Sequence, residues 1–173
     1  MNLLATGFPV AILQALKMVL LIPPTVDGEA IYLENEKPGG PRVLIDLAPL
    51  EAAGVLSKVA LTGDEFDLVV QLARTVDDGE AEVIAIGLRR GLEIATDDRK
   101  ARRIALGQGG VLLSTPDLLL RWQTSASIPD QVMGQILGSV GRRSRYRPPV
   151  AHPLHKWWMD LLVQDQAHGR GDI

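Results

Sequence analysis

The sequence predicts an α/β fold in which a parallel sheet is covered by helices on both faces. Apolar runs of strand length alternate with stretches of helical periodicity, and the connections between them are short. The run Met18–Ile22 (MVLLI) has no polar interruption, as expected for a parallel strand that is buried on both faces. Beyond Ser125 the pattern becomes purely helical, so we expect a helical extension after the α/β part.

The composition fits a single globular domain and excludes several classes of function. The 173 residues are 46% hydrophobic and 23% charged and contain no cysteine, which excludes disulfides and thiolate metal sites. The net charge of −3 argues against nucleic-acid binding through whole-molecule charge, so such binding would need local basic patches. The apolar run Phe8–Ile22 is interrupted by Gln14 and Lys17, so we expect no membrane span. No positive charge precedes this run, so we expect no signal peptide, and the absence of cysteine suits a cytoplasmic protein.

The first part of the chain is expected to place helices on either side of its first strand. One helix begins at Pro9 and runs to about Lys17. A second helix begins at Thr25, runs past the acidic residue Glu29 and includes Leu33. The elements expected next are a loop at 34–41, strands at Val43–Leu47 and Val55–Leu61, and a helix at Asp64–Arg74.

The central stretch Asp77–Ser114 is expected to contain two helices and two strands. Asp77 is a plausible N-cap, and Glu80 follows three residues later, which is a capping-box spacing. This helix ends at Gly91. The later elements are expected to be a strand at Leu92–Ala95, a helix at Asp98–Leu106, a strand at Val111–Leu113, and helices at Thr115–Trp122, Pro129–Val140 and Pro153–Val163.

Acidic residues are expected at the carboxyl ends of neighbouring strands, where open parallel sheets bind ligands. Glu29 follows the first strand, Glu80 lies in the first turn of a helix, and Asp97 and Asp98 follow the next strand. Two carboxylates about 4 Å apart repel by roughly 4 kcal/mol at an effective dielectric constant near 20, so such a cluster needs a cation or raised pKa values. Oxygen ligands without cysteine favour Mg²⁺ or Mn²⁺ over Zn²⁺.

Each of these acids also has an ordinary structural role when it is taken singly. Glu80 fits the third helical position of a capping box, and Asp98 fits the N-cap of the next helix. Glu29 fits an exposed position on its helix. Only their shared location at strand ends favours a metal site over these separate roles.

Two basic clusters are candidates for phosphate contacts. The first flanks the acidic pair, and the second surrounds Tyr146, whose ring could stack on a base. The alternatives are a solvated helix face for the first cluster, and a partner-binding or merely solubilising link for the second. The candidate phosphate-binding residues are Arg99, Lys100, Arg142, Arg143 and Arg145.

Other catalytic and nucleotide-binding motifs are absent from the sequence. There is no G-x-S-x-G, no P-loop lysine motif and no G-x-G-x-x-G. The glycine-rich segment Gly107–Gly110 leads into a strand rather than into a helix, which is the wrong order for phosphate binding. The missing glycine-rich loop therefore makes a nucleotide-binding α/β protein the weakest functional hypothesis.

Two motifs resemble the PIN-domain nucleases, especially the toxin-type branch of prokaryotic toxin–antitoxin pairs. They are GEAEVIAIGLRRG (Gly79–Gly91) and, after it, TDDRKARRIA (Thr96–Ala105). The resemblance is extended by NLLATG (Asn2–Gly7) and IPPTVDGEAIYL (Ile22–Leu33), and it covers roughly residues 2–122.

This resemblance implies a three-layer α/β/α domain with a parallel central sheet at 1–124, and a helical extension at 125–173 packed on it. Family members gather acidic residues around Mg²⁺ or Mn²⁺ to hydrolyse single-stranded RNA. Carried over by position, the catalytic acids fall on Glu29, on Glu80 with Glu82 as its neighbour, and on Asp98 or Asp97. The partners it implies are single-stranded RNA, an antitoxin protein and a second copy of the chain.

The chain departs from the family pattern at its start. The family begins with an apolar strand that ends in the first essential Asp, whereas this sequence starts at Met1-Asn2, inside the segment that follows. We therefore expect the N-terminal strand to be missing and activity to be impaired, through either a misplaced start codon or a truncated copy. The alternative function is a catalytically inactive module that binds RNA or protein through its basic link and the Trp157-Trp158 helix.

Overall fold

The computed structural model describes residues 1–29, 31–37 and 39–168, which group into two compact units. The acidic unit consists of Val19–Glu29 and Gly54–Thr115. The helical unit consists of Met1–Met18, Ala30–Ala53 and Pro116–Ile173. The division into a domain at 1–124 and an extension at 125–173 stays a prediction.

The acidic unit contains two parallel pairs of short strands. Strand β1 (Leu20–Ile22) pairs with β4 (Leu56–Lys58), and β5 (Glu93–Ala95) pairs with β6 (Val111–Leu113). The parallel pairing and the α/β class are as predicted. The expected continuous sheet is not formed by the described strands. Instead, within the described residues, β1 pairs only with β4 and β5 pairs only with β6, so these strands form two separate sheets.

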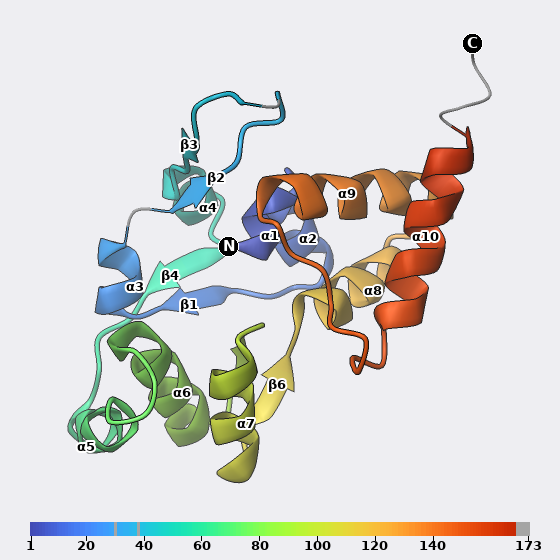
Figure 1. Cartoon of the computed structure of the whole chain (residues 1–173). Helices are drawn as coiled ribbons and strands as arrows, with labels where there is room; N and C mark the ends of the chain where they lie inside the picture. The colour runs from blue at the N-terminus through green and yellow to red at the C-terminus, as the bar shows by residue number, and fades with distance from the viewer. Residues whose placement is uncertain (30, 38, 169–173) are drawn as a thin grey trace. The chain divides into compact units, whose positions relative to one another are not determined.

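The described helices of this unit are α3 (Pro24–Gly28), α5 (Gly63–Leu72), α6 (Asp78–Arg90) and α7 (Arg99–Gly107). Helix α6 lies between α5 and α7 and also contacts β5 (Figure 1). A Cβ atom at Gly87 would lie 2.2 Å from Cγ1 of Ile94, so the backbone of α6 rests directly on that strand. The core of the unit includes Leu68, Leu72, Ile84, Ile94, Ala101 and Ala105.

An ion pair between a buried carboxylate and an exposed arginine joins the start of α5 to the end of α6. The Glu65 side chain is 1% exposed, and its carboxylate accepts from Arg90 Nε at 2.6 Å and Arg90 Nη2 at 2.9 Å. Glu65 also completes a capping box with Thr62, whose backbone N–H donates to it at 2.7 Å. The hydrogen bond from Arg90, opposed by burial and helped by Thr62, lowers the pKa of Glu65 to about 2.

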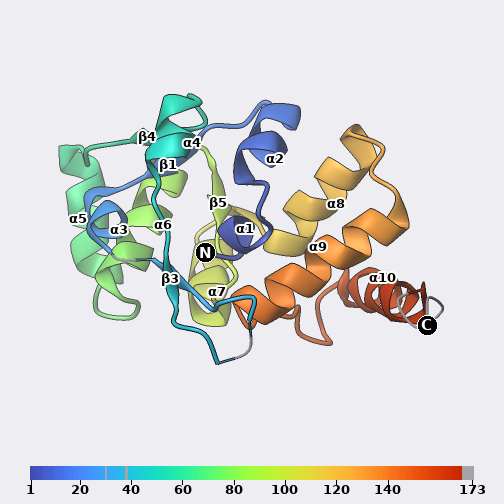
Figure 2. The same cartoon turned by 90° about the horizontal axis from the view of Figure 1, so that it is seen from above.

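The helical unit combines helices with one two-stranded antiparallel sheet. Helices α9 and α10 lie side by side in both views (Figures 1 and 2), and α1 contacts α9. Trp158 is fully buried, and the ring of Tyr146 packs edge-on against it with 5.7 Å between the ring centroids. The elements of this unit are α1 (Asn2–Ala5), α2 (Pro9–Ala15), β2 (Tyr32–Leu33), β3 (Val43–Leu44), α4 (Ala48–Ala52), α8 (Thr115–Ser125, which begins at the last residue of the acidic unit), α9 (Asp130–Arg143) and α10 (His155–His168). No helix in the described part of the chain is long and apolar enough to cross a membrane.

Two predictions about local structure are wrong. The helix after the first strand ends at Gly28, so Glu29 lies just beyond α3, and Leu33 belongs to a strand. Glycine is a poor helix former, whereas the aromatic and aliphatic residues at Tyr32 and Leu33 suit the sheet they form with β3. Helix α4 was missed, although Pro49 at its first turn is a helix-start signal.

Candidate acidic site

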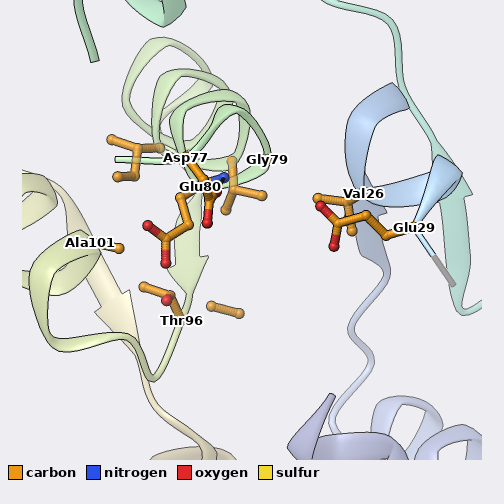
Figure 3. A pocket seen from close by; sticks show the side chains of 10 residues that line it. Val26, Glu29, Asp77, Gly79, Glu80, Thr96 and Ala101 are labelled. Atoms are coloured by element: carbon orange, nitrogen blue, oxygen red, sulfur yellow. Dashed lines mark hydrogen bonds between the residues drawn. The ribbon is translucent and has the colours of Figure 1, made fainter. Parts of the chain in front are cut away.

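A pocket of about 250 Å³ lies in the acidic unit beside the N-terminus of α6. Its walls come from the end of α3, the first turns of α6, the end of β5 and the start of α7 (Figure 3). Two of its lining residues, Glu29 and Glu80, are among the predicted catalytic acids. The remaining lining residues are Val26, Asp77, Gly79, Val83, Ile84, Ala95, Thr96 and Ala101.

Glu80 occupies the first turn of α6 because Asp77 caps this helix. Asp77 Oδ1 accepts a hydrogen bond from the Glu80 backbone N–H at 2.8 Å, which confirms the predicted N-cap. The side chain of Glu80 points toward Thr96 (Figure 3). Burial raises the pKa of Glu80, and the negative charges of Asp77 and Asp98 raise this pKa further, whereas Lys100 opposes the shift. The pocket therefore holds a carboxyl group whose negative charge is poorly compensated.

Glu29 faces the pocket from the side opposite Glu80 (Figure 3). Its backbone is extended, with φ −82° and ψ 132°, directly after α3. A Cβ atom added to Gly79 would lie 3.3 Å from Glu29 Oε1 and 3.4 Å from Val26 Cγ2. The glycine therefore allows the Glu29 carboxylate to approach the first turn of α6 closely.

Asp98 has the capping role that was its alternative interpretation. Its Oδ1 accepts from the backbone N–H groups of Lys100 at 2.7 Å and Ala101 at 2.8 Å, at the start of α7. Its charge nevertheless acts on Glu80, because it contributes to the raised pKa of that residue. Capping and a contribution to the acidic site are therefore compatible for Asp98.

Asp97, the other member of the pair, is bound to Thr115. One carboxylate oxygen accepts from the Thr115 backbone N–H at 3.0 Å, and the other accepts from its hydroxyl group. These bonds join the segment after β5 to the first residue of α8, two residues after the end of β6. The predicted metal ligand Asp97 therefore has both carboxylate oxygens in hydrogen bonds and is not among the residues that line the pocket.

Glu82 makes a similar pair of bonds to Thr25. Its side chain is buried, and its oxygens accept from the Thr25 backbone N–H at 3.1 Å and from the hydroxyl at 2.8 Å. The sequence identified Glu82 only as a neighbour of a metal ligand. One signal in the sequence could have indicated this contact. Pro23, at the N-cap of α3, has no side-chain acceptor for the N–H groups of the first turn, so these groups need an acceptor from elsewhere in the chain.

The donor set suits a hard divalent cation in a partly hydrated state. In the part of the chain that the structure describes, no group of three or more His, Asp or Glu residues is arranged to hold a metal ion. Mg²⁺, however, is commonly bound through one or two carboxylates together with water and substrate phosphates. Glu29 and Glu80 are two such carboxylates at one pocket. Burial, and then the charges of Asp77 and Asp98, raise the pKa of Glu80, and a cation there would oppose this shift by favouring the ionised form.

The basic candidates divide between the two units. Arg99 and Lys100 are exposed in the first turn of α7, next to Asp98 and in the same unit as the pocket. The other three belong to the helical unit. There Arg143 donates to the Ala5 carbonyl at 3.3 Å and lies 4.0 Å from Glu36, Arg145 pairs with Glu34 at 3.1 Å, and Arg142 is exposed.

Parallel strand pairs, covering helices and a carboxylate-lined pocket at strand ends define an α/β protein with an acidic site. A family model described as a PIN domain (DUF3368) matches residues 2–149, most of the chain. The chain therefore belongs to the PIN-domain family, which has a nuclease-type fold, and the predicted resemblance is confirmed. No curated protein and no solved structure matches it significantly.

Proposed function

We propose that this PIN-domain protein is a metal-dependent endoribonuclease that acts on single-stranded RNA at the acidic pocket. The observation that carries the proposal is the position of Glu80, a partly buried carboxyl group with a raised pKa that faces Glu29 across the pocket. Perturbed carboxyl groups in pockets are frequent at catalytic sites. The nuclease-type fold supports the same chemistry.

In this proposal Glu29 and Glu80 hold Mg²⁺ or Mn²⁺, and Asp98 adds negative charge beside them. The bound ion would supply Lewis-acid polarisation of the phosphodiester and a lowered pKa for water. Glu80 acts as a ligand in its ionised form, which a bound cation would favour. Asp77 fixes the backbone of Glu80 at the start of α6, and Asp98 fixes the first turn of α7.

Substrate binding is assigned to the basic residues nearest the pocket. Arg99 and Lys100 are exposed at the start of α7 and can meet the phosphates of an RNA strand. In the helical unit Arg142 is exposed, whereas the contacts of Arg143 and Arg145 with acidic residues would have to be exchanged for RNA contacts. An antitoxin partner and a homodimer belong to the same proposal and are supported by the toxin-type sequence motifs.

The test is cleavage of a labelled single-stranded RNA oligonucleotide by the full chain with Mn²⁺, with Mg²⁺ or with chelator. In line with the impaired activity expected from the sequence, we expect slow cleavage that needs the metal, is lost in Glu80→Gln and is retained in Asp78→Asn. Asp78 is a matched control because it is an exposed acid in the same helical turn that does not line the pocket. Cleavage that persists in chelator and in Glu80→Gln would contradict the proposal.

A second candidate function is a catalytically inactive RNA-binding module. It is favoured by the absence of a three-ligand metal group among the described residues and by the exposed basic side chains of Arg99, Lys100 and Arg142. This module would bind single-stranded RNA without added metal, with an affinity that falls steeply as the salt concentration rises. Filter binding in chelator, at several salt concentrations, separates it from the nuclease.

A further inference from the structure

We propose that Glu82 is a positioning residue of the acidic pocket, which acts through Thr25 to hold Glu29 opposite Glu80. The inference rests on the proposed metal-binding function of this pocket. Glu82 lies on α6, only two residues after Glu80, yet its carboxylate binds α3 rather than lining the pocket. The two acids of this helix therefore have different roles.

Helix α3 is too short to be stable without contacts to the rest of the unit. It has 5 residues, and isolated helices of this length are unstable in water. Its N-cap residue, Pro23, makes no side-chain capping bond, so the first-turn N–H groups need an acceptor from elsewhere. Glu82, which is 57 residues away in the sequence, accepts the backbone N–H of Thr25 and thereby caps α3 from a neighbouring helix.

The bonds of Glu82 hold α3 more firmly than the ion pair that α3 makes between Asp27 and Lys58 at 2.9 Å. The side chains of that ion pair, Asp27 and Lys58, are 33% and 52% exposed. Exposed pairs of this kind contribute little to stability. Glu82 is 8% exposed, so a carboxylate oxygen that loses its donor there cannot readily be compensated by water.

The hydrogen bonds between Glu82 and Thr25 lie next to the pocket whose carboxylates they are proposed to position. Glu29 directly follows α3, and its Oε1 approaches the first turn of α6 at Gly79. Figure 3 shows Glu29 and Glu80 on opposite sides of the pocket, carried by these two segments. Any movement of α3 along α6 therefore changes the separation of the two carboxylates that are proposed to share an ion.

The experiment measures Mn²⁺ affinity by calorimetric titration of the full chain. We expect Thr25→Val and Glu82→Gln each to weaken Mn²⁺ binding roughly 10-fold, the lower end of the range for residues that orient metal ligands. Thr25→Ser keeps the hydroxyl group and should restore wild-type affinity. The double variant Thr25→Val/Glu82→Gln should lose less than the product of the two single losses, because both changes disrupt one interaction.

Thr62→Val is the matched control. Thr62 also caps a helix of the acidic unit through its hydroxyl, but it does not line the pocket. This variant should unfold more easily and bind Mn²⁺ as tightly as the wild type. Amide hydrogen exchange gives a readout independent of the metal, since residues 23–29 should exchange faster in Thr25→Val while α6 keeps its protection.

The outcomes separate this inference from the proposed function. If Thr25→Val speeds exchange at residues 23–29 but binds Mn²⁺ like the wild type, the positioning role of Glu82 is wrong and the metal site stands. If Thr25→Ser fails to restore affinity, the hydroxyl bond is not the cause and the inference is again wrong. If the wild-type chain binds no Mn²⁺, the proposed metal function itself fails. Should Glu82→Gln not fold, the Thr25→Val and Thr25→Ser pair decides the question.

Discussion

Asp97 accepts two hydrogen bonds from Thr115, one from its backbone N–H at 3.0 Å and one from its hydroxyl group. Glu82 binds Thr25 in the same way. The sequence has two pairs of neighbouring acids, Glu80 with Glu82 and Asp97 with Asp98. One carboxylate of each pair, Glu82 or Asp97, binds a threonine from a distant segment. The neighbouring carboxylates, Glu80 and Asp98, carry the negative charge around the pocket.

Replacing Thr115 by Val should destabilise the protein by about 1–2 kcal/mol, because the buried hydroxyl and its hydrogen bond to Asp97 are lost. Urea denaturation measures the change in unfolding free energy. Thr124→Val is the control, since the hydroxyl of Thr124 is exposed and donates only to the Leu120 carbonyl of its own helix. Equal effects of the two changes would contradict the role given to Thr115.

The ion pair of Glu65 and Arg90 should make stability depend on acidic pH. The pKa of Glu65 falls from 4.5 to about 2 on folding, so its contribution is fully present above pH 4.5 and is lost as the pH falls toward 2. Glu65→Gln should cost on the order of 3 kcal/mol at neutral pH, the free energy that corresponds to the fall of the Glu65 pKa from 4.5 to about 2.

The difference in unfolding free energy between wild type and Glu65→Gln should shrink as the pH falls through this window. Chemical denaturation at a series of pH values measures it. Asp64→Asn, a change at the exposed neighbour of Glu65, should show a much smaller difference. A difference for Glu65→Gln that is independent of pH would show that charge is not the cause.

Gly87→Ala should destabilise the protein by about 1–3 kcal/mol through overpacking, because the new Cβ would lie 2.2 Å from a side-chain atom of Ile94. Thermal unfolding is the measurement. Gly107→Ala is the matched control at the last position of α7, where an added Cβ meets no atom within 4 Å.

Lys100→Gln should raise the pKa of Glu80 further, because the positive charge of Lys100 is the one contribution that lowers it. A carbon-detected NMR titration of the Glu80 carboxyl group in metal-free protein measures this pKa. Arg103→Gln removes an exposed charge from the same helix and should leave the pKa of Glu80 nearly as it is in the wild type. An unchanged or lower value in Lys100→Gln would contradict the assigned electrostatic contacts.

Features set by neighbouring residues could be predicted from the sequence, and features set by distant ones could not. The N-caps Asp77 and Asp98 follow from local capping rules, and both are confirmed. The threonine partners of Glu82 and Asp97 lie 57 and 18 residues away, and no periodic pattern reports such a pairing.

The position of Glu29 shows the same limit. Helical periodicity continued past Gly28, but pairing with β3 places Leu33 in a strand and leaves Glu29 in extended backbone. The parallel pairing of the strands was predictable from their apolar runs. Their division into the pairs β1–β4 and β5–β6 was not, because the sequence pattern of one strand does not show which other strand will form hydrogen bonds with it.

Helix α6 presents Glu80 to the pocket, Glu82 to α3 and Arg90 to α5, all within 13 residues. An α-helix advances by about 100° per residue, so the angular phase of these side chains is fixed only while the helix keeps its length. Removing or adding one residue between Glu82 and Arg90 would turn one end away from its partner. We therefore expect α6 to accept many substitutions on its exposed side and no insertion or deletion.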